Sequence, residues 1–279
     1  MSSNYIRTQT RRTLILLVIT ALTLGLLLWG NKALQTSTYT VTSTQLPPEF
    51  EGYTIAQISD LHNTEFGHGN QRLLGRLREA NPNIIVLTGD LIDSHKTDTA
   101  LALSFARQAS SIAPTYYITG NHEAWLGEGL GLFLTQLAAT GVTILRDQTT
   151  TLHHRGASIT LVGLDDPDAA TQPTAQRLQP LVNPQDYEIL LAHRPEGIQI
   201  YASTGADLVL SGHAHGGQIR LPFLGGLIAP GQGFLPAYDA GTYQEGKTTL
   251  VVSRGLGNSL VPLRINNRPE LVVITLGKE

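Results

Sequence analysis

Short apolar runs recur along this chain, and segments with a helical period separate several of them. The length and the β-branched content of the apolar runs predict β-strands. The expected strands are Tyr53–Ser59, Ile84–Thr88, Thr115–Thr119, Ser158–Gly163, Tyr187–Ala192, Leu208–Ser211, Thr248–Ser253 and Leu271–Leu276. The expected helices are Gln71–Glu79, Thr99–Ser110 and Gly131–Thr140. This alternation restricts the chain to a layered α/β domain, and the closer spacing of the later strands predicts hairpins and a second sheet.

The composition limits what the domain can bind. A chain of 279 residues with an apolar fraction of 41% can bury a large core. The net charge is −3 at pH 7 and the isoelectric point is about 6.3, so a broad electrostatic contact with nucleic acid is not expected. The chain contains no cysteine, which excludes disulfides and thiolate metal sites. A bound metal would therefore need oxygen and imidazole ligands.

The N-terminal segment indicates a membrane anchor. Residues 13–30 are uncharged and mostly apolar, and their length approaches the thickness of a bilayer core. They have no polar face, which disfavours a helix buried in a soluble domain. Arg7, Arg11 and Arg12 precede them, and positive charge is typical of the cytoplasmic side. We expect residues 1–12 to be a basic cytoplasmic end, residues 13–30 a single-pass signal anchor, and the rest of the chain to lie outside the cytoplasm.

Two alternatives for this N-terminal segment stay open. It could be a cleaved signal peptide, although residues 30–35 show no Ala-x-Ala cleavage pattern. The pair Arg11-Arg12 matches a twin-arginine export signal, or it only enforces orientation. Residues 31–48 are rich in Thr, Ser and Gln, and we expect a linker there with a first edge strand near Tyr39 to Thr42. The folded domain would then cover residues 49–279.

Polar residues gather where five of the expected strands end. These segments are Asp60-Leu61-His62, Gly89-Asp90, Gly120-Asn121-His122-Glu123, His193-Arg194 and Gly212-His213-Ala214-His215-Gly216-Gly217. Ligand sites of open α/β sheets form beyond the carboxyl ends of the strands, so we expect the five segments to meet at one edge. Residues i and i+2 of an extended segment point the same way, so Asp60 and His62 can reach one ion together. Carboxylate, amide and imidazole groups suit hard or borderline divalent cations.

Taken in order, these segments match the pattern D-x-H, G-D, G-N-H-[DE], H and G-H-x-H, so the chain resembles the calcineurin-like metallophosphoesterases. The runs Gly212–Ile219 and Ser253–Gly257 are especially similar to the exported or membrane-anchored bacterial branch of that family. The resemblance covers about residues 47–276. It implies a four-layer α/β/β/α sandwich, in which two mixed β-sheets pack face to face and helices flank them.

The resemblance also implies a role for each polar residue. Two divalent metal ions (Mn, Fe or Zn) would be bound. Asp60, His62 and His215 would hold the first ion, Asn121, His193 and His213 the second, and Asp90 would bridge both. His122 would not bind metal but would face the substrate phosphate and, as an imidazolium, protonate the leaving oxygen. Glu123 could orient the His122 ring.

These features favour a dinuclear phosphoesterase, and specifically a phosphodiesterase that acts at the outer face of the membrane. In such a site a hydroxide that bridges the metals attacks the phosphate in line. The substrate would be a phosphate ester, such as a lipid head group or a cell-wall polymer. The alternatives are a phosphomonoesterase and a non-catalytic anchored protein that binds metal or phosphate. A nuclease is disfavoured by the acidic composition and the anchor, and no feature of the sequence indicates an oligomeric state.

Several other polar residues near these segments receive weaker interpretations. They are His68, His95, His153, His154, Asp93, Asp165, Asp166, Asp168, Arg194 and Arg254. The histidines are expected in loops or solvated turns, and Asp93 as a brace for the loop after Asp90. The three aspartates after the Ser158–Gly163 strand could hold an accessory ion, but such clusters are more often solvated. The two arginines could contact a phosphate oxygen, although surface ion pairs are the more common role for them.

Overall fold

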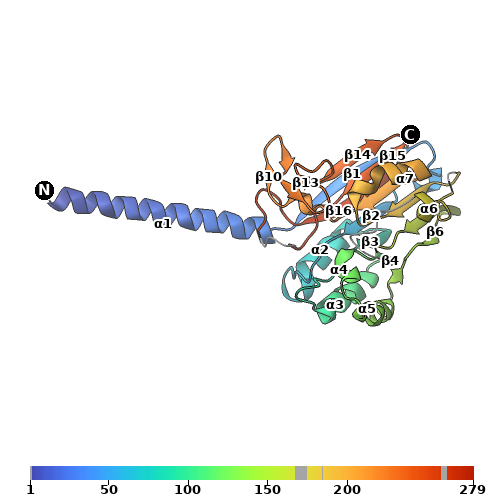
Figure 1. Ribbon diagram of the computed structural model, residues 1–279, viewed down its shortest axis with the longest axis horizontal. Coiled ribbons are helices and arrows are strands. Elements are labelled where there is room, and N and C mark those ends of the chain that lie inside the picture. Colours follow the sequence, from blue (N-terminus) through green and yellow to red (C-terminus); the bar gives the residue numbers. More distant parts are fainter. Residues whose placement is uncertain (1, 167–174, 184, 259–262) are drawn as a thin grey trace.

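The described part of the chain forms a long N-terminal helix and a folded domain (Figure 1). The structure is a computed structural model that describes residues 2–166, 175–183, 185–258 and 263–279. The helix, α1 (Ser2–Lys32), projects away from the domain. Its stretch Arg7–Lys32 is long and apolar enough to cross a membrane, and only 6% of its most apolar window is buried in the protein.

The first sheet has six strands in the order β1-β16-β2-β3-β4-β5. Their bounds are β1 Gln35–Ser43, β2 Thr54–Ile58, β3 Ile84–Thr88, β4 Thr115–Ile118, β5 Thr143–Ile144 and β16 Glu270–Lys278. Strands β2 to β5 run parallel, whereas β16 is antiparallel to β2 and parallel to β1. The carboxyl ends of β2, β3 and β4 therefore lie at the same edge of this sheet.

The second sheet also has six strands, in the order β14-β15-β9-β8-β7-β6. Their bounds are β6 Gln148–His154, β7 Ala157–Gly163, β8 Glu188–Leu191, β9 Leu208–Ser211, β14 Gly241–Glu245 and β15 Thr248–Val252. Strands β7, β8, β9 and β15 are parallel, and the edge strands β6 and β14 pair antiparallel with their neighbours. Both sheets are thus mixed, with a parallel centre.

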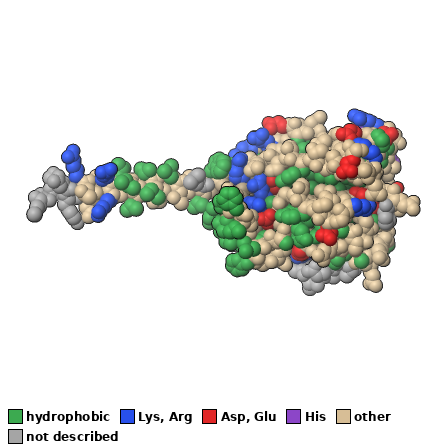
Figure 2. Space-filling view, turned by 90° about the horizontal axis from the view of Figure 1, so that it is seen from above, with side chains coloured by type: hydrophobic (Ala, Val, Ile, Leu, Met, Phe, Trp, Pro, Cys, Tyr) green, Lys and Arg blue, Asp and Glu red, His purple; other side chains and the backbone are tan. Residues whose placement is uncertain are grey.

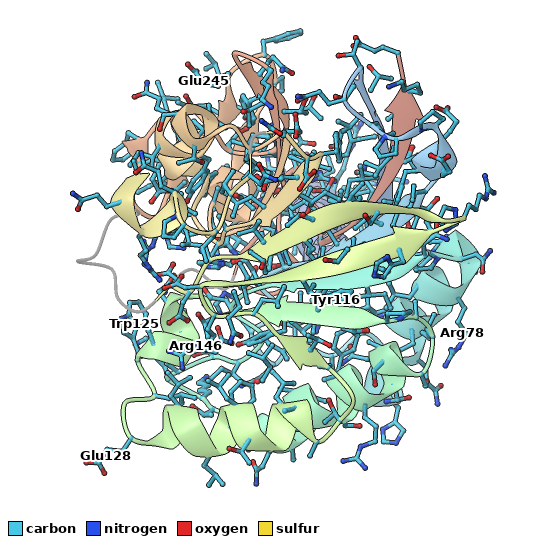
Figure 3. All side chains as sticks on the ribbon, turned by 90° about the vertical axis from the view of Figure 1, so that its right-hand side faces the viewer. Arg78, Tyr116, Trp125, Glu128, Arg146 and Glu245 are labelled. Carbon is cyan, nitrogen blue, oxygen red and sulfur yellow. The ribbon has the colours of Figure 1, made fainter. Side chains whose placement is uncertain are left out.

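Helices cover the outer faces of the two sheets (Figures 1 and 3). The longer ones are α2 Gln71–Ala80, α3 Thr99–Ser110 and α5 Gly129–Ala138 beside the first sheet, and α7 Ile198–Thr204 beside the second. The short ones are α4 Asn121–Ala124, α6 Ala175–Leu178, η1 Pro48–Phe50, η2 His68–Asn70, η3 Pro195–Gly197 and η4 His215–Gly217. Two small hairpins follow η4: β10 Arg220–Leu221 with β11 Gly225–Gly226, and β12 Ile228–Ala229 with β13 Gly233–Phe234.

Three buried clusters hold these layers together. On β3, Ile85 packs toward α2, α3 and α5, whereas its neighbour Val86 packs into the cluster between the sheets. The third cluster joins the other face of the second sheet to α6 and α7. Because both faces of the central strands are covered, their sequences are continuous apolar runs. The four-layer sandwich expected from the sequence is confirmed.

The differences from the sequence expectation lie at the edges. The edge strand expected near Tyr39 to Thr42 is confirmed but is longer than expected, because β1 covers Gln35–Ser43. The expected linker before it is reduced to Ala33 and Leu34, since α1 continues to Lys32. The expected solvated turn at His153 and His154 is wrong, because both residues belong to β6. The ring of His154 packs 5.1 Å from that of Tyr53.

Candidate metal centre

The five polar segments meet where the carboxyl ends of the two sheets touch. The buried side chain of Gln57 in β2 donates a hydrogen bond to the carbonyl of Ser211 at the end of β9, at 2.9 Å. Beyond these strand ends, the backbone N–H of His213 donates to Oδ1 of Asp60 at 3.1 Å. The two sheets thus bring segments that are about half the chain apart in sequence to one place.

The backbone turns sharply at these strand ends. The φ angle is 51° at Asp60, 44° at His62, 52° at Asp90, 64° at His213 and 49° at His215. Left-handed φ is uncommon for residues other than glycine, and such residues concentrate at functional sites, where the surrounding structure holds them. The turns direct five candidate ligands inward rather than continuing the strands.

The first group of candidate ligands is Asp60, His62, Asp90 and His215, whose ligand atoms all lie within 4.8 Å of one another. The Nε2 atom of His62 lies 3.2 Å from Nε2 of His215 and 3.6 Å from Oδ2 of Asp90. The Nε2 atom of His215 lies 3.5 Å from Oδ1 of Asp60. All four side chains are buried, as an ion shielded from water requires.

The second group shares Asp90 with the first and adds His193 and His213. The Nε2 atom of His193 lies 3.3 Å from Oδ2 of Asp90, 3.2 Å from Nδ1 of His213 and 3.2 Å from Oδ1 of Asn121. The other ring nitrogen of His193, Nδ1, donates to the carbonyl of Thr88 at 2.8 Å, which leaves Nε2 free to act as a ligand. The seven residues expected to bind metal therefore lie together in two groups that share one carboxylate.

The spacing of these atoms fits divalent cations. Metal–ligand bonds of about 2.0–2.2 Å separate neighbouring ligand atoms by roughly 3.0–3.6 Å. The separations of 3.2 to 3.6 Å in both groups fall in this range. Oxygen and imidazole donors without thiolate suit Mn, Fe and Zn.

Protons occupy this site when metal does not. Burial alone would lower the pKa of His193, but the carboxylates of Asp90 and Asp60 raise it to about 10. Burial alone would raise the pKa of Asp90, yet His193 and His62 hold it well below its usual range. Burial lowers the pKa of His62 to about 4. The metal-free site thus carries its positive charge on His193, paired with Asp90.

His122 lies beside the first group without belonging to it. Its ring centroid is 4.4 Å from that of His62, and its backbone N–H donates to Oδ1 of Asp90 at 2.8 Å. Its Nδ1 accepts a hydrogen bond from the backbone N–H of Ser94 at 3.1 Å, so the proton of the ring sits on Nε2. Burial also lowers the pKa of His122. Both observations favour a neutral imidazole with its proton on Nε2 over the imidazolium expected from the sequence.

Contrary to the expectation from the sequence, Glu123 does not orient the His122 ring. Its fully buried carboxylate instead accepts hydrogen bonds from the backbone N–H groups of Asp90 at 2.9 Å, Leu91 at 2.8 Å and Gly120 at 2.8 Å. These donors belong to the loops that follow β3 and β4. Glu123 thus fixes the backbone that carries the shared ligand Asp90, and through it the geometry of both groups.

An ion pair between Arg194 and Asp166 is the feature of the site that the sequence interpretation missed. Both residues are only 7% exposed, and Nε of Arg194 lies 2.8 Å from Oδ2 of Asp166. A second guanidinium nitrogen lies 3.2 Å from Nε2 of His213. Burial, His193 and Arg194 together hold the pKa of His213 well below its usual range, so its ring is neutral, as a ligand must be. The sequence does carry one signal for this ion pair: Asp166 follows β7, and β7 lies next to β8, the strand that ends before His193.

The remaining weaker candidates lie around the site or away from it. Asp93 accepts from the backbone N–H of His95 at 2.8 Å and so braces its loop, as expected. With His122 these two residues form a third, partly exposed group of possible ligands. Asp165 pairs with Arg146 at 2.7 Å and Arg254 with Glu270 at 2.9 Å, while His68 lies in η2. Asp168 lies outside the described residues.

Comparisons with known proteins agree with this geometry. A family profile described as calcineurin-like phosphoesterase matches residues 53–217. The uncharacterized metallophosphoesterase YkuE of Bacillus subtilis is 34% identical over 253 residues, which cover 87% of this chain and 85% of YkuE. The phosphodiesterase YaeI of Escherichia coli is 32% identical over 208 residues, which cover 71% of this chain and 72% of YaeI.

A relative from a vertebrate is named as a transmembrane protein with this kind of domain. The transmembrane protein with metallophosphoesterase domain of Bos taurus is 29% identical over 284 residues, which cover 95% of this chain and 62% of that protein. Its name agrees with the membrane-spanning length of α1. From the extent of the family match and the identity to YkuE, it follows that this chain is a member of the calcineurin-like phosphoesterase family.

Proposed function

We propose that this protein is a membrane-anchored phosphodiesterase that uses two divalent metal ions, Mn, Fe or Zn, and acts at the outer face of the membrane. The observation that carries the proposal is the sharing of Asp90 by two converging groups of buried ligands, with His122 beside them. A site that held metal only for structure would not need this additional imidazole. That difference favours an enzyme over a non-catalytic protein that binds metal or phosphate.

The chemistry would be divided between the ions and the chain. Bound metal ions would neutralise a phosphate and activate water for attack in line with the leaving group. The seven ligands Asp60, His62, Asp90, Asn121, His193, His213 and His215 would hold the ions. His122 would donate a hydrogen bond from Nε2 to a phosphate oxygen, where negative charge increases in the transition state.

The aromatic ring next to His122 favours a phosphodiester over a phosphomonoester as the substrate. The indole of Trp125 packs 4.8 Å from the His122 ring and is 49% exposed, at the same edge of the domain as Arg146 (Figure 3). An exposed aromatic ring there would suit the second organic group that a diester carries and a monoester lacks. The name of the relative YaeI supports the same preference.

The proposal is tested with a panel of phosphate monoesters and diesters, including lipid head groups and wall polymers, assayed with added Mn²⁺. We expect diesters to be hydrolysed fastest, and Asp90→Ala to lose both activity and bound metal because one carboxylate serves both groups. Glu128→Ala, which removes an exposed carboxylate immediately before α5, is the matched control and should behave as wild type. Faster turnover of monoesters would reassign the protein as a phosphomonoesterase. Hydrolysis of no ester by metal-loaded protein would favour the binding protein.

A further inference from the structure

Two hairpins near the base of α1 expose large apolar side chains. The turn between β10 and β11 carries Phe223 and Leu224, whose side chains are 108% and 66% exposed. The end of the second hairpin, at β13, carries Phe234 and Leu235, which are 75% and 58% exposed. With Leu221 and Ile228 these four residues form what we name the hairpin patch. Among the described residues outside α1 and this patch, the exposed large hydrophobic side chains are Ile265, Trp125 and Leu132.

The hairpin patch lies at the end of the domain from which α1 leaves. Both hairpins are at this end in Figure 1, and Figure 2 shows hydrophobic side chains gathered there beside the helix. Hydrogen bonds connect the two features: the backbone N–H of Arg264 donates to Oδ1 of Asn31 in α1 at 3.0 Å, and the backbone N–H of Arg220 in β10 donates to the carbonyl of Ile265 at 3.0 Å. One short segment thus links the helix to the first hairpin.

The base of α1 is fixed to the domain by further contacts. The guanidinium of Arg268 donates to the carbonyl of Ala33 at 2.9 Å and lies 4.6 Å from the centre of the Trp29 ring. The hairpins are also tied to the domain, because the N–H of Leu227 donates to the carbonyl of Gly217 in η4 at 3.1 Å. The direction of α1 therefore also fixes which face of the domain meets the membrane surface.

We propose that the hairpin patch inserts into the bilayer that α1 spans, so that the domain docks on the membrane instead of hanging from a tether. Trp29 and Lys32 close the apolar stretch of α1, and residues of these types lie at the level of the lipid head groups. The hairpins lie beside that level. Apolar side chains on an interfacial element bury about 5–10 Å into the boundary between head groups and acyl chains.

Shape and charge both favour lipid over a protein partner. The patch consists of protruding turns, with Phe223 as exposed as a side chain can be, and turns of this kind enter between lipids without a complementary groove. The φ angle of Phe223 is 68°, a conformation in which glycine or asparagine would be less strained. Lys32 in the last turn of α1 and Arg268, which contacts Ala33, carry positive charge at the base of the helix, and Figure 2 shows Lys and Arg side chains where the helix meets the domain. This charge complements anionic head groups.

The absence of cysteine makes a direct test simple. A single cysteine at Phe223→Cys in the full chain is labelled with an environment-sensitive NBD dye, and the protein is reconstituted in vesicles of phosphatidylcholine and phosphatidylglycerol. Leu132→Cys on α5, whose side chain is 65% exposed in the native protein, is the matched control. We expect blue-shifted emission at position 223 and several-fold stronger quenching there by lipids that carry a nitroxide than at position 132. Equal, water-like signals at both positions would overturn the proposal.

A second comparison separates lipid from other occupants. A blue shift that nitroxide lipids do not quench and that grows with protein density would assign the patch to a second copy of the chain and reject insertion. Adding Phe234→Ser and Leu235→Ser to the labelled protein should reduce the quenching at position 223, because both hairpins would share the insertion. Unchanged quenching would reject the participation of the second hairpin. Both side chains are exposed, so the fold and the metal content should not change.

Discussion

At the scale of single residues, the metal-free site depends on the ion pair between His193 and Asp90, whose Nε2 and Oδ2 atoms lie 3.3 Å apart. The pKa of His193 is raised to about 10, so its ring holds a proton at neutral pH that a divalent cation must displace. We predict that the affinity for Mn²⁺ rises with pH up to that pKa, by roughly tenfold per pH unit for one released proton. Calorimetric titration in buffers of different ionisation enthalpy counts the released protons.

His62, the neighbouring ligand, is the comparison for the proton held by His193. The pKa of His62 is lowered to about 4, so its ring carries no extra proton at neutral pH, and a released proton is expected from His193 alone of these two rings. A raised pKa in the folded state stabilises the fold below the unfolded pKa, and this contribution is lost as pH rises through the folded value. The metal-free protein should therefore lose stability as pH approaches 10. For the metal titration, a count of zero released protons in the wild type would contradict the assignment of the proton to His193.

His122 permits a residue-scale test of catalysis apart from metal binding. We predict that His122→Asn keeps both metals and the fold but lowers kcat/KM by about 10²–10³-fold, because one donor to the phosphate is lost. A neutral donor acts on the phosphate, so nitrophenyl and alkyl esters should lose similar factors. A larger loss for the alkyl ester, which needs a proton on its leaving oxygen, would restore the imidazolium acid. Ser94→Ala removes the hydroxyl 3.1 Å from Nδ1 of His122 but keeps the backbone N–H that fixes the tautomer, so it should lose far less activity than His122→Asn.

At the scale of elements, burial decides which strands the sequence reveals. Both faces of β3 are covered, so Ile84–Thr88 is a continuous apolar run that predicts a strand with the observed bounds. The edge strands β1 and β6 are rich in threonine and bury one side chain each, Val41 and Leu152, so the sequence predicts only part of β1 and does not predict β6. The strands of the two small hairpins have two residues each, too few for any period. The candidate ligands were predictable because each follows a central strand. The contacts of Glu123 and Arg194 were not, because they depend on how loops from different strands pack.

Gly89 tests the element scale at the end of β3. Its φ angle is 90°, and an added Cβ would lie 2.6 Å from Nδ1 of His193 and 2.8 Å from the backbone of Gly120. We predict that Gly89→Ala destabilises the fold by roughly 1–3 kcal/mol and also weakens metal binding, because His193 must move. Denaturant unfolding with and without Mn²⁺ measures both effects.

Gly75→Ala in α2, where a Cβ meets no atom within 4 Å, should instead stabilise by about 0.5–1 kcal/mol. Similar unfolding curves for the two variants would refute the close packing at Gly89.

At the scale of the whole molecule, α1 and the domain are one structural unit. Hydrogen bonds from Arg264 and Arg268 to the end of α1 leave no flexible linker between helix and sheet. With α1 spanning the membrane as proposed above, these contacts would set the position of the candidate metal centre relative to the membrane surface. The charges that flank α1 predict which side of the membrane the centre would face.

We predict that the domain lies outside the cytoplasm, because Arg7, Arg11 and Arg12 precede the apolar stretch and positive charge stays on the cytoplasmic side. A reporter enzyme that works only outside the cytoplasm, fused after Glu279, should be active, and one that works only inside should be silent. The double variant Arg11→Lys with Arg12→Lys keeps the charge and removes the twin-arginine pair, so retained export would assign these arginines to orientation alone, and lost export would assign them to a twin-arginine signal. Activity of the cytoplasmic reporter alone would reverse the topology and, with it, the proposed action at the outer face.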